Sequence, residues 1–143
     1  MSTWRRKALA LFPELKGSLN DPDCEPFSVF VDLVPLAITA HLEDDRDTLR
    51  RVHGYAEWAL RQGGKLWQVA AIGFYEDLLR IVGGVPWERI VPWLSPYAVA
   101  EIRKTWALGI QGEDLPKLER LVESRREQPY QTHVYSTGEI QDL

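Results

Sequence analysis

Three carboxylates occupy a similar setting in three successive stretches of the chain. Asp32, Glu57 and Glu76 each stand two positions after an aromatic residue. His53 precedes Glu57 by four residues, so the two side chains share one face of a helix, the geometry with which a helix presents two metal ligands. One hypothesis is therefore a metal-dependent or acid–base enzyme, with these carboxylates converging between helices and His53, Glu57 and Glu76 as the metal ligands.

A simpler interpretation treats both glutamates as residues of a solvated helix surface. Glu57 and Arg61, and likewise Glu76 and Arg80, stand four residues apart and can form ion pairs there. The Glu-x-x-His motifs of di-metal bundles and the His-Glu-x-x-His motif of zinc proteases do not occur. Cys24 is the only cysteine, which excludes a cysteine-based zinc site. We therefore expect no catalytic residue set and no cofactor, and keep the metal or acid–base enzyme as the alternative.

The sequence contains six tryptophans, which is many for 143 residues. Tryptophan often anchors interfaces because it combines a large apolar area with a polar group. Trp87 and Trp93 flank a proline-containing segment, where exposure would be better explained by binding than by packing. The candidate interaction residues are therefore Trp87, Trp93, Asp32, Glu57 and Glu76. A further hypothesis places a small-molecule ligand in an apolar cleft beside Trp58, Trp67 and Tyr75.

Composition and charge narrow the class of protein. Hydrophobic residues make up 45% of the chain and charged residues 27%, as in folded globular domains. The net charge of −4 disfavours nucleic-acid binding. No apolar run reaches the length of about 18 residues that a membrane span needs, and no apolar export segment follows the basic start. We expect a cytoplasmic protein without a membrane-spanning segment.

The hydrophobic pattern predicts one helical domain over residues 1–127 and a C-terminal tail over 128–143, which lacks a helical stripe. A loop is expected over 17–26 and a short turn over 87–91. Ser95 followed by Pro96 predicts a helix N-terminus. The main predicted helices span residues 27–43, 45–62, 65–82, 96–108 and 114–122.

Two of these helices carry most of the expected packing. Residues 27–43 show one helical stripe, formed by Phe27, Phe30, Val31, Val34, Ile38 and Leu42. Residues 65–82 are apolar around most of their circumference, so we expect this helix to lie in the centre of the core. Within it, Gly73 is expected to mark a close approach by another helix.

Short connections, such as Gly63-Gly64, favour neighbouring helices that pack as hairpins. The fold class is therefore all-α. Two arrangements remain open at this point: stacked antiparallel helical hairpins similar to armadillo or HEAT units, and a compact irregular bundle of about six helices.

Several segments together resemble a family of small bacterial proteins of unknown function. The resemblance covers about residues 4–122 and rests on Phe30-Val31-Asp32-Leu33, Gly54-Tyr55-Ala56-Glu57-Trp58, Ala71-Ile72-Gly73-Phe74-Tyr75-Glu76-Asp77-Leu78 and Leu94-Ser95-Pro96. It implies an all-helical fold, a bacterial origin and a binding role, because some members resemble immunity proteins that neutralise a toxin. No catalytic residues are assigned in that family. We therefore expect a non-enzymatic protein-binding module, for which a cationic toxin would be a suitable partner.

Overall fold

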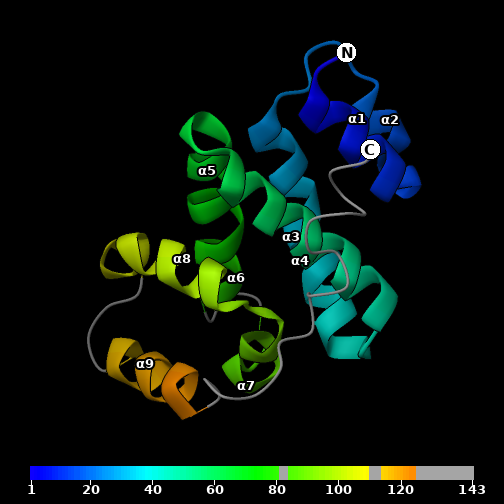
Figure 1. Cartoon of the computed structure of the whole chain (residues 1–143). Coiled ribbons are helices and arrows are strands. Elements are labelled where there is room, and N and C mark those ends of the chain that lie inside the picture. Colours follow the sequence, from blue (N-terminus) through cyan, green and yellow to red (C-terminus); the bar gives the residue numbers. More distant parts are fainter. Residues whose placement is uncertain (81–83, 110–113, 125–143) are drawn as a thin grey trace.

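The computed structural model of the chain describes residues 1–80, 84–109 and 114–124, and the regular elements in these ranges are all helical, with no strand (Figure 1). The all-α prediction is therefore confirmed. In chain order the elements are α1 (Thr3–Leu11), the 3-10 turn η1 (Pro13–Leu15), α2 (Lys16–Leu19), α3 (Pro26–Glu43), α4 (Arg46–Gln62), α5 (Gly64–Ala70), the π-helical segment η2 (Ala71–Glu76), α6 (Asp77–Leu79), α7 (Trp87–Ile90), the 3-10 turn η4 (Val91–Trp93), α8 (Pro96–Gly109) and α9 (Asp114–Ser124).

Helix α4 crosses the middle of the molecule, with α3 behind it and α7 and α8 on the opposite side (Figure 1). Every residue from 52 to 60 is buried, so this helix is enclosed on all sides. Asp45 caps its start by accepting a hydrogen bond from the Thr48 backbone amide. Gly63 ends it with φ 72° and ψ −173°, a backbone conformation that is nearly confined to glycine.

The helix predicted over 65–82 consists of α5, η2 and α6 in direct succession. Ala70, Gly73, Phe74 and Leu78 are buried, as expected. The segment lies between α3, α4 and α8, so the expectation that it is part of the core is confirmed, although Ile72 is partly exposed and α4 is enclosed more completely. Helix α3 approaches Gly73, as expected, since a Cβ there would lie 3.5 Å from the ring of Phe27 and 3.9 Å from the Cβ of Phe30.

Helix α3 exposes half of the stripe that its sequence suggested. A helical stripe normally marks the side that faces the core, yet Phe27, Val31 and Leu42 are 53%, 50% and 53% exposed. Of the six stripe residues only Phe30 is buried. The buried side of α3 is a second apolar face, formed by Val29, Phe30, Leu33, Ala37, Ala40 and His41.

Among the described residues, α3 is the one helix that is long and apolar enough to cross a membrane by length and composition, with a mean hydropathy of 1.3 over 18 residues. The expectation that no such stretch exists was therefore wrong. A third of this window is buried within the fold, and α3 contacts α1, α4, α5, η2 and α6. Core helices of globular domains pass the same test.

Short helices occur in two places where the sequence suggested loops or turns. Helix α2 occupies the start of the expected loop 17–26, and α7 followed by η4 replaces the expected turn over 87–91. The N-cap at Ser95 is confirmed, since its hydroxyl accepts a hydrogen bond from the Ala98 amide at 3.1 Å. The predicted tail over 128–143 lies outside the described residues.

Candidate functional site

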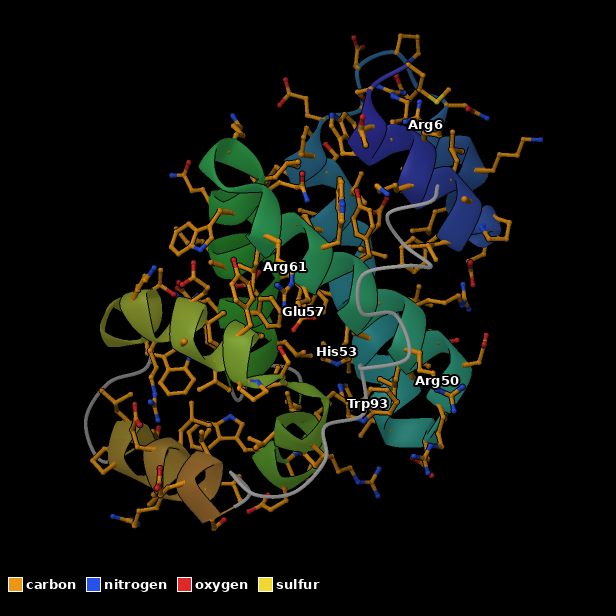
Figure 2. The ribbon with its side chains drawn as sticks, in the orientation of Figure 1. Arg6, Arg50, His53, Glu57, Arg61 and Trp93 are labelled. Carbon is orange, nitrogen blue, oxygen red and sulfur yellow. The ribbon has the colours of Figure 1, made fainter. Side chains whose placement is uncertain are left out.

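The ionisable candidates on α4 form a polar row, which we define as His53, Glu57 and Arg61. Figure 2 shows the three residues following one another along α4, with Trp93 beyond His53. The His53 imidazole stacks on the Trp93 indole, with ring centroids 5.8 Å apart and an interplanar angle of 18°. Trp93 is itself buried, so its expected role as an exposed binding residue was wrong.

The other two members of the polar row also contact the connection between η4 and α8. The Ser95 hydroxyl donates a hydrogen bond to a Glu57 carboxylate oxygen. The Arg61 guanidinium carbon lies 4.0 Å from the centre of the Tyr97 ring, in cation–π geometry. Together with the stacked ring of Trp93, these contacts hold the connection against α4.

The spacing of the two elements explains how two of these contacts form side by side. Residues four apart on an α-helix are separated by about 6 Å along its axis. Alternate residues of an extended chain are separated by about 6.6 Å, and Leu94 between Trp93 and Ser95 has extended dihedral angles of −94° and 116°. The extended backbone at Leu94 therefore lets Trp93 and Ser95 reach His53 and Glu57, whereas Tyr97 reaches Arg61 from the first turn of α8.

Glu57 is a buried carboxylate rather than the solvated surface residue that the simpler interpretation assumed. Its side chain is 9% exposed, and Arg61 Nε lies 4.0 Å from its second carboxylate oxygen. Burial raises the pKa of Glu57, and the positive charge of Arg61 opposes that rise. Burial also raises the pKa of the neighbouring Tyr75 hydroxyl well above its usual value, with the Glu57 carboxylate adding to the effect.

His53 forms a second buried polar contact, with His41 of α3. The two Nε2 atoms lie 2.9 Å apart, so one imidazole donates a hydrogen to the other. Within the described part of the chain, His53 Nδ1 is buried without a hydrogen-bond partner. At this buried position an Nδ1 atom without a hydrogen costs less free energy than an Nδ1–H group without an acceptor. This favours the tautomer in which His53 donates through Nε2–H.

Both imidazoles of this pair are neutral at pH 7. Burial, together with the nearby positive charge of Arg89, lowers the pKa of His41 to about 4. Burial lowers the pKa of His53 well below its usual value, with His41 as a second cause. The pair is therefore a hydrogen-bonded connection between α3 and α4 that cannot accept a proton without a loss of stability.

A shallow groove of about 380 Å³ lies beside His41 at the end of α3. His41, Leu49 and Trp93, all buried residues, contribute to its wall. Asp44, Glu88 and Arg89 contribute charged groups of both signs. The Arg89 guanidinium donates hydrogen bonds to the carbonyls of His41 and Leu42, so it serves to close the end of α3.

The remaining carboxylates of the metal hypothesis lie elsewhere. Glu76, whose side chain is only 9% exposed, pairs with Arg80 at 2.5 Å. Asp32 is half-buried on α3. In the ranges that the structure describes, no group of three or more His, Cys, Asp or Glu side chains is placed to hold a metal ion. The structure thus does not bring His53, Glu57 and Glu76 together as ligands.

The other aromatic candidates take part in packing. Half-buried Trp87 donates its indole N–H to the Leu79 carbonyl at 2.6 Å, which ties α7 to the end of α6. Trp58 is buried and stacks on Tyr55, and Tyr75 packs edge-on against Phe74. Trp67 donates to Glu101 at 3.1 Å. The rings of Trp58 and Tyr75 are therefore part of the core, where the ligand hypothesis placed a cleft.

The largest exposed apolar feature in the described residues is on α3. We define the α3 apolar stripe as Phe27, Val31, Pro35, Ile38 and Leu42, which follow one another at helical spacing along the solvent side. Ile38 is half-buried and the other four are exposed.

Comparison with known proteins places the chain in a family but not with a characterised relative. No curated protein and no solved structure matches the chain. The family model described as a domain of unknown function (DUF7674) matches residues 5–107, which include α3, the polar row of α4 and residues 93–97. The chain therefore belongs to this family of domains of unknown function.

Proposed function

We propose that the protein is a non-enzymatic protein-binding module that binds its partner through the α3 apolar stripe. The observation that carries this proposal is the exposure of Phe27, Val31 and Leu42, each about half accessible, in one row on one helix. Exposed apolar residues scattered singly need no explanation, whereas a continuous apolar face on a domain surface is typical of an interaction site.

The ionisable residues support binding rather than catalysis. Glu57 forms a hydrogen bond with Ser95, and His53 forms one with His41. The Glu57 carboxylate and both imidazoles are buried. A general acid or base must reach a substrate proton within hydrogen-bond distance. The polar row instead contacts residues 93–97 of the same chain. Its residues are therefore explained by a structural role, since they hold residues 93–97 against α4.

A toxin-neutralising immunity protein is the specific form of this function that we propose. The resemblance described above and the acidic balance of the chain support it, because an acidic surface favours association with a cationic toxin. A bacterial origin and a cytoplasmic location belong to the same proposal.

Site-specific photo-crosslinking in the native cells tests the proposal. A crosslinking residue is placed at Leu42 on the stripe or at Thr39, which is exposed on the same helix outside it. We expect one defined partner protein to be captured from Leu42 and not from Thr39, and Val31→Asp to abolish the capture. Equal capture from both positions, or capture insensitive to Val31→Asp, would contradict binding through this face.

Co-expression tests the immunity function. The captured partner is produced with the wild-type chain or with the Val31→Asp variant. We expect the partner to arrest growth alone and with the variant but not with the wild type. A partner that is harmless without this protein would remove the immunity interpretation and leave the binding function intact.

A further inference from the structure

The α3 apolar stripe has the shape of a surface for another helix. With about 100° between successive residues, its five members fall within an arc of about 100°. From Phe27 to Leu42 the stripe is about 22 Å long, since each residue advances the helix by 1.5 Å. The Phe27 ring packs against Gly73 of η2. The neighbouring residue Ile72 is also partly exposed and extends the apolar surface onto η2.

The charged residues of the segment that contains the stripe are all acidic. Residues 20–45 contain seven acidic and no lysine or arginine residues, whereas the whole chain has 21 acidic and 17 basic residues. The seven acidic residues are Asp21, Asp23, Glu25, Asp32, Glu43, Asp44 and Asp45. Apart from half-buried Asp32 they are all exposed. The negative charge is thus concentrated at the two ends of the stripe.

Three arginines from other elements lie near these ends: Arg5 and Arg89, which donate to backbone carbonyls, and Arg46 of α4, which follows Asp45 and lines the same groove as Asp44 and Arg89. Arg5 of α1 donates to the carbonyls of Leu19 and Cys24, before the start of α3. Arg89 donates to the carbonyls of His41 and Leu42 at the other end. Arg5 and Arg89 stabilise the two ends of α3, and the exposed carboxylates outnumber the arginines.

We infer that the α3 apolar stripe binds an amphipathic helix of a partner protein, and that this helix carries basic residues at both ends of its apolar face. The inference rests on the proposed binding function and specifies its partner. A helix of about 15–18 residues would cover the stripe, and its apolar residues at i, i+3, i+4 and i+7 spacing would pack on α3. Its terminal lysines or arginines would face the two groups of carboxylates.

The same charges disfavour the other occupants of an apolar helix face. In an antiparallel pair of two copies, Asp21, Asp23 and Glu25 of one copy would face Glu43 and Asp44 of the other. A parallel pair would oppose like residues directly. Either arrangement sets carboxylate against carboxylate, and the anionic surface of a membrane would be repelled in the same way.

Titration of the full-length protein with two designed peptides tests the inference. Both peptides are helices of about 18 residues with a leucine face, one with lysines at both ends and one with glutamates in those places. We expect saturable binding of the lysine peptide, followed by fluorescence anisotropy, and weak or no binding of the glutamate peptide. Binding should weaken as salt is raised, because the terminal charges are exposed.

Two variants with the same charge change locate the binding. Val31→Asp lies in the stripe, and we expect it to weaken binding of the lysine peptide by a factor of about ten or more. Thr39→Asp lies on the same helix outside the stripe and should leave the affinity within about twofold. Circular dichroism of both variants confirms that each is folded. Equal effects of the two changes, or equal binding of both peptides, would overturn the inference.

The remaining outcomes separate this inference from the proposed function. If Val31→Asp abolishes photo-capture of the native partner but neither peptide binds, the binding function stands and the basic helical partner is wrong. Sedimentation of the wild type as a dimer that Val31→Asp dissociates would assign the stripe to a second copy. Adsorption to phosphatidylserine-containing vesicles that Val31→Asp abolishes would assign it to a membrane. Either result overturns the inference.

Discussion

Removing His41 should change how the stability of the protein depends on pH. In the native state burial holds the pKa of His41 at about 4, whereas in the unfolded chain it returns to its ordinary value of 6.5. Between these values the unfolded chain binds a proton and the native protein does not. The stability contributed by neutral His41 is therefore fully present above pH 6.5 and is lost as the pH falls towards 4.

The magnitude follows from the same two values. One pKa unit corresponds to about 1.4 kcal/mol, so His41 alone should account for a loss of about 3 kcal/mol between pH 7.5 and pH 4. The depressed pKa of His53 acts in the same direction and adds to this loss. The raised pKa of Glu57 acts in the opposite direction, because a carboxyl that is buried more easily when protonated favours folding at low pH.

Urea denaturation of the wild type and of His41→Gln, measured in steps from pH 7.5 to pH 4, isolates the histidine. The contribution of Glu57 is common to both proteins and cancels in their difference. We expect the free energy of unfolding of the wild type, relative to the variant, to fall by about 3 kcal/mol over this range. His133 lies outside the described residues, and a His133→Gln variant measures its contribution separately. A wild-type-minus-variant difference that stays constant with pH would refute a buried, neutral His41.

Three further substitutions test the packing around the polar row and the core, each by equilibrium denaturation at neutral pH. Ser95→Ala should cost about 2–3 kcal/mol, because it removes the N-cap of α8 and leaves the buried Glu57 carboxylate without its hydrogen-bond donor. Glu57→Gln keeps an acceptor for the Ser95 hydroxyl and should cost less than about 1 kcal/mol. Phe74→Ala should cost about 3–5 kcal/mol, since the ring is fully buried, and Ile72→Ala in the same segment should cost less than half as much. Gly63→Ala should cost about 1–3 kcal/mol, because φ is 72° and ψ is −173° there.

Each of these expectations has a result that contradicts it. Equal costs for Ser95→Ala and Glu57→Gln would show that the hydrogen bond between them contributes nothing. A small effect of Phe74→Ala would place η2 outside the core. For Gly63 the control is Gly17→Ala, since Gly17 has ordinary helical geometry and no atom within 4 Å of an added Cβ. If both glycine substitutions have the same effect, the strain assigned to Gly63 is absent.

Features with a local cause could be predicted from the sequence. The N-cap at Ser95 and the stop at Gly63 depend only on residues a few positions away, and both occur in the structure. The helical class follows from periodicity in the same way. Such signals act within one turn of the chain, so they do not depend on which other helix lies opposite.

The polar contacts of α4 depend on elements that the sequence does not place. Glu57 with Arg61 four residues later reads as a surface ion pair, and only the arrival of Ser95 from 38 positions away makes it a buried hydrogen bond. His41 and His53 are 12 residues apart across the α3–α4 turn, a spacing that marks no ligand set. No local signal marks the contacts of residues 53, 57 and 61 with residues 93, 95 and 97, because recognising them requires knowing that the two segments face each other.

Helix α3 shows how an apolar pattern can predict a helix and still leave its function open. Its sequence contains two apolar faces, and periodicity selected the one with the larger side chains. The fold buries the other face, which includes the small residues Ala37 and Ala40 and the polar His41, and leaves Phe27, Val31 and Leu42 in contact with water. Large exposed apolar side chains add little to the stability of the isolated chain, because their surface is removed from water only when something covers it. An apolar row with carboxylates at both ends therefore has a physical explanation if a basic amphipathic helix covers it.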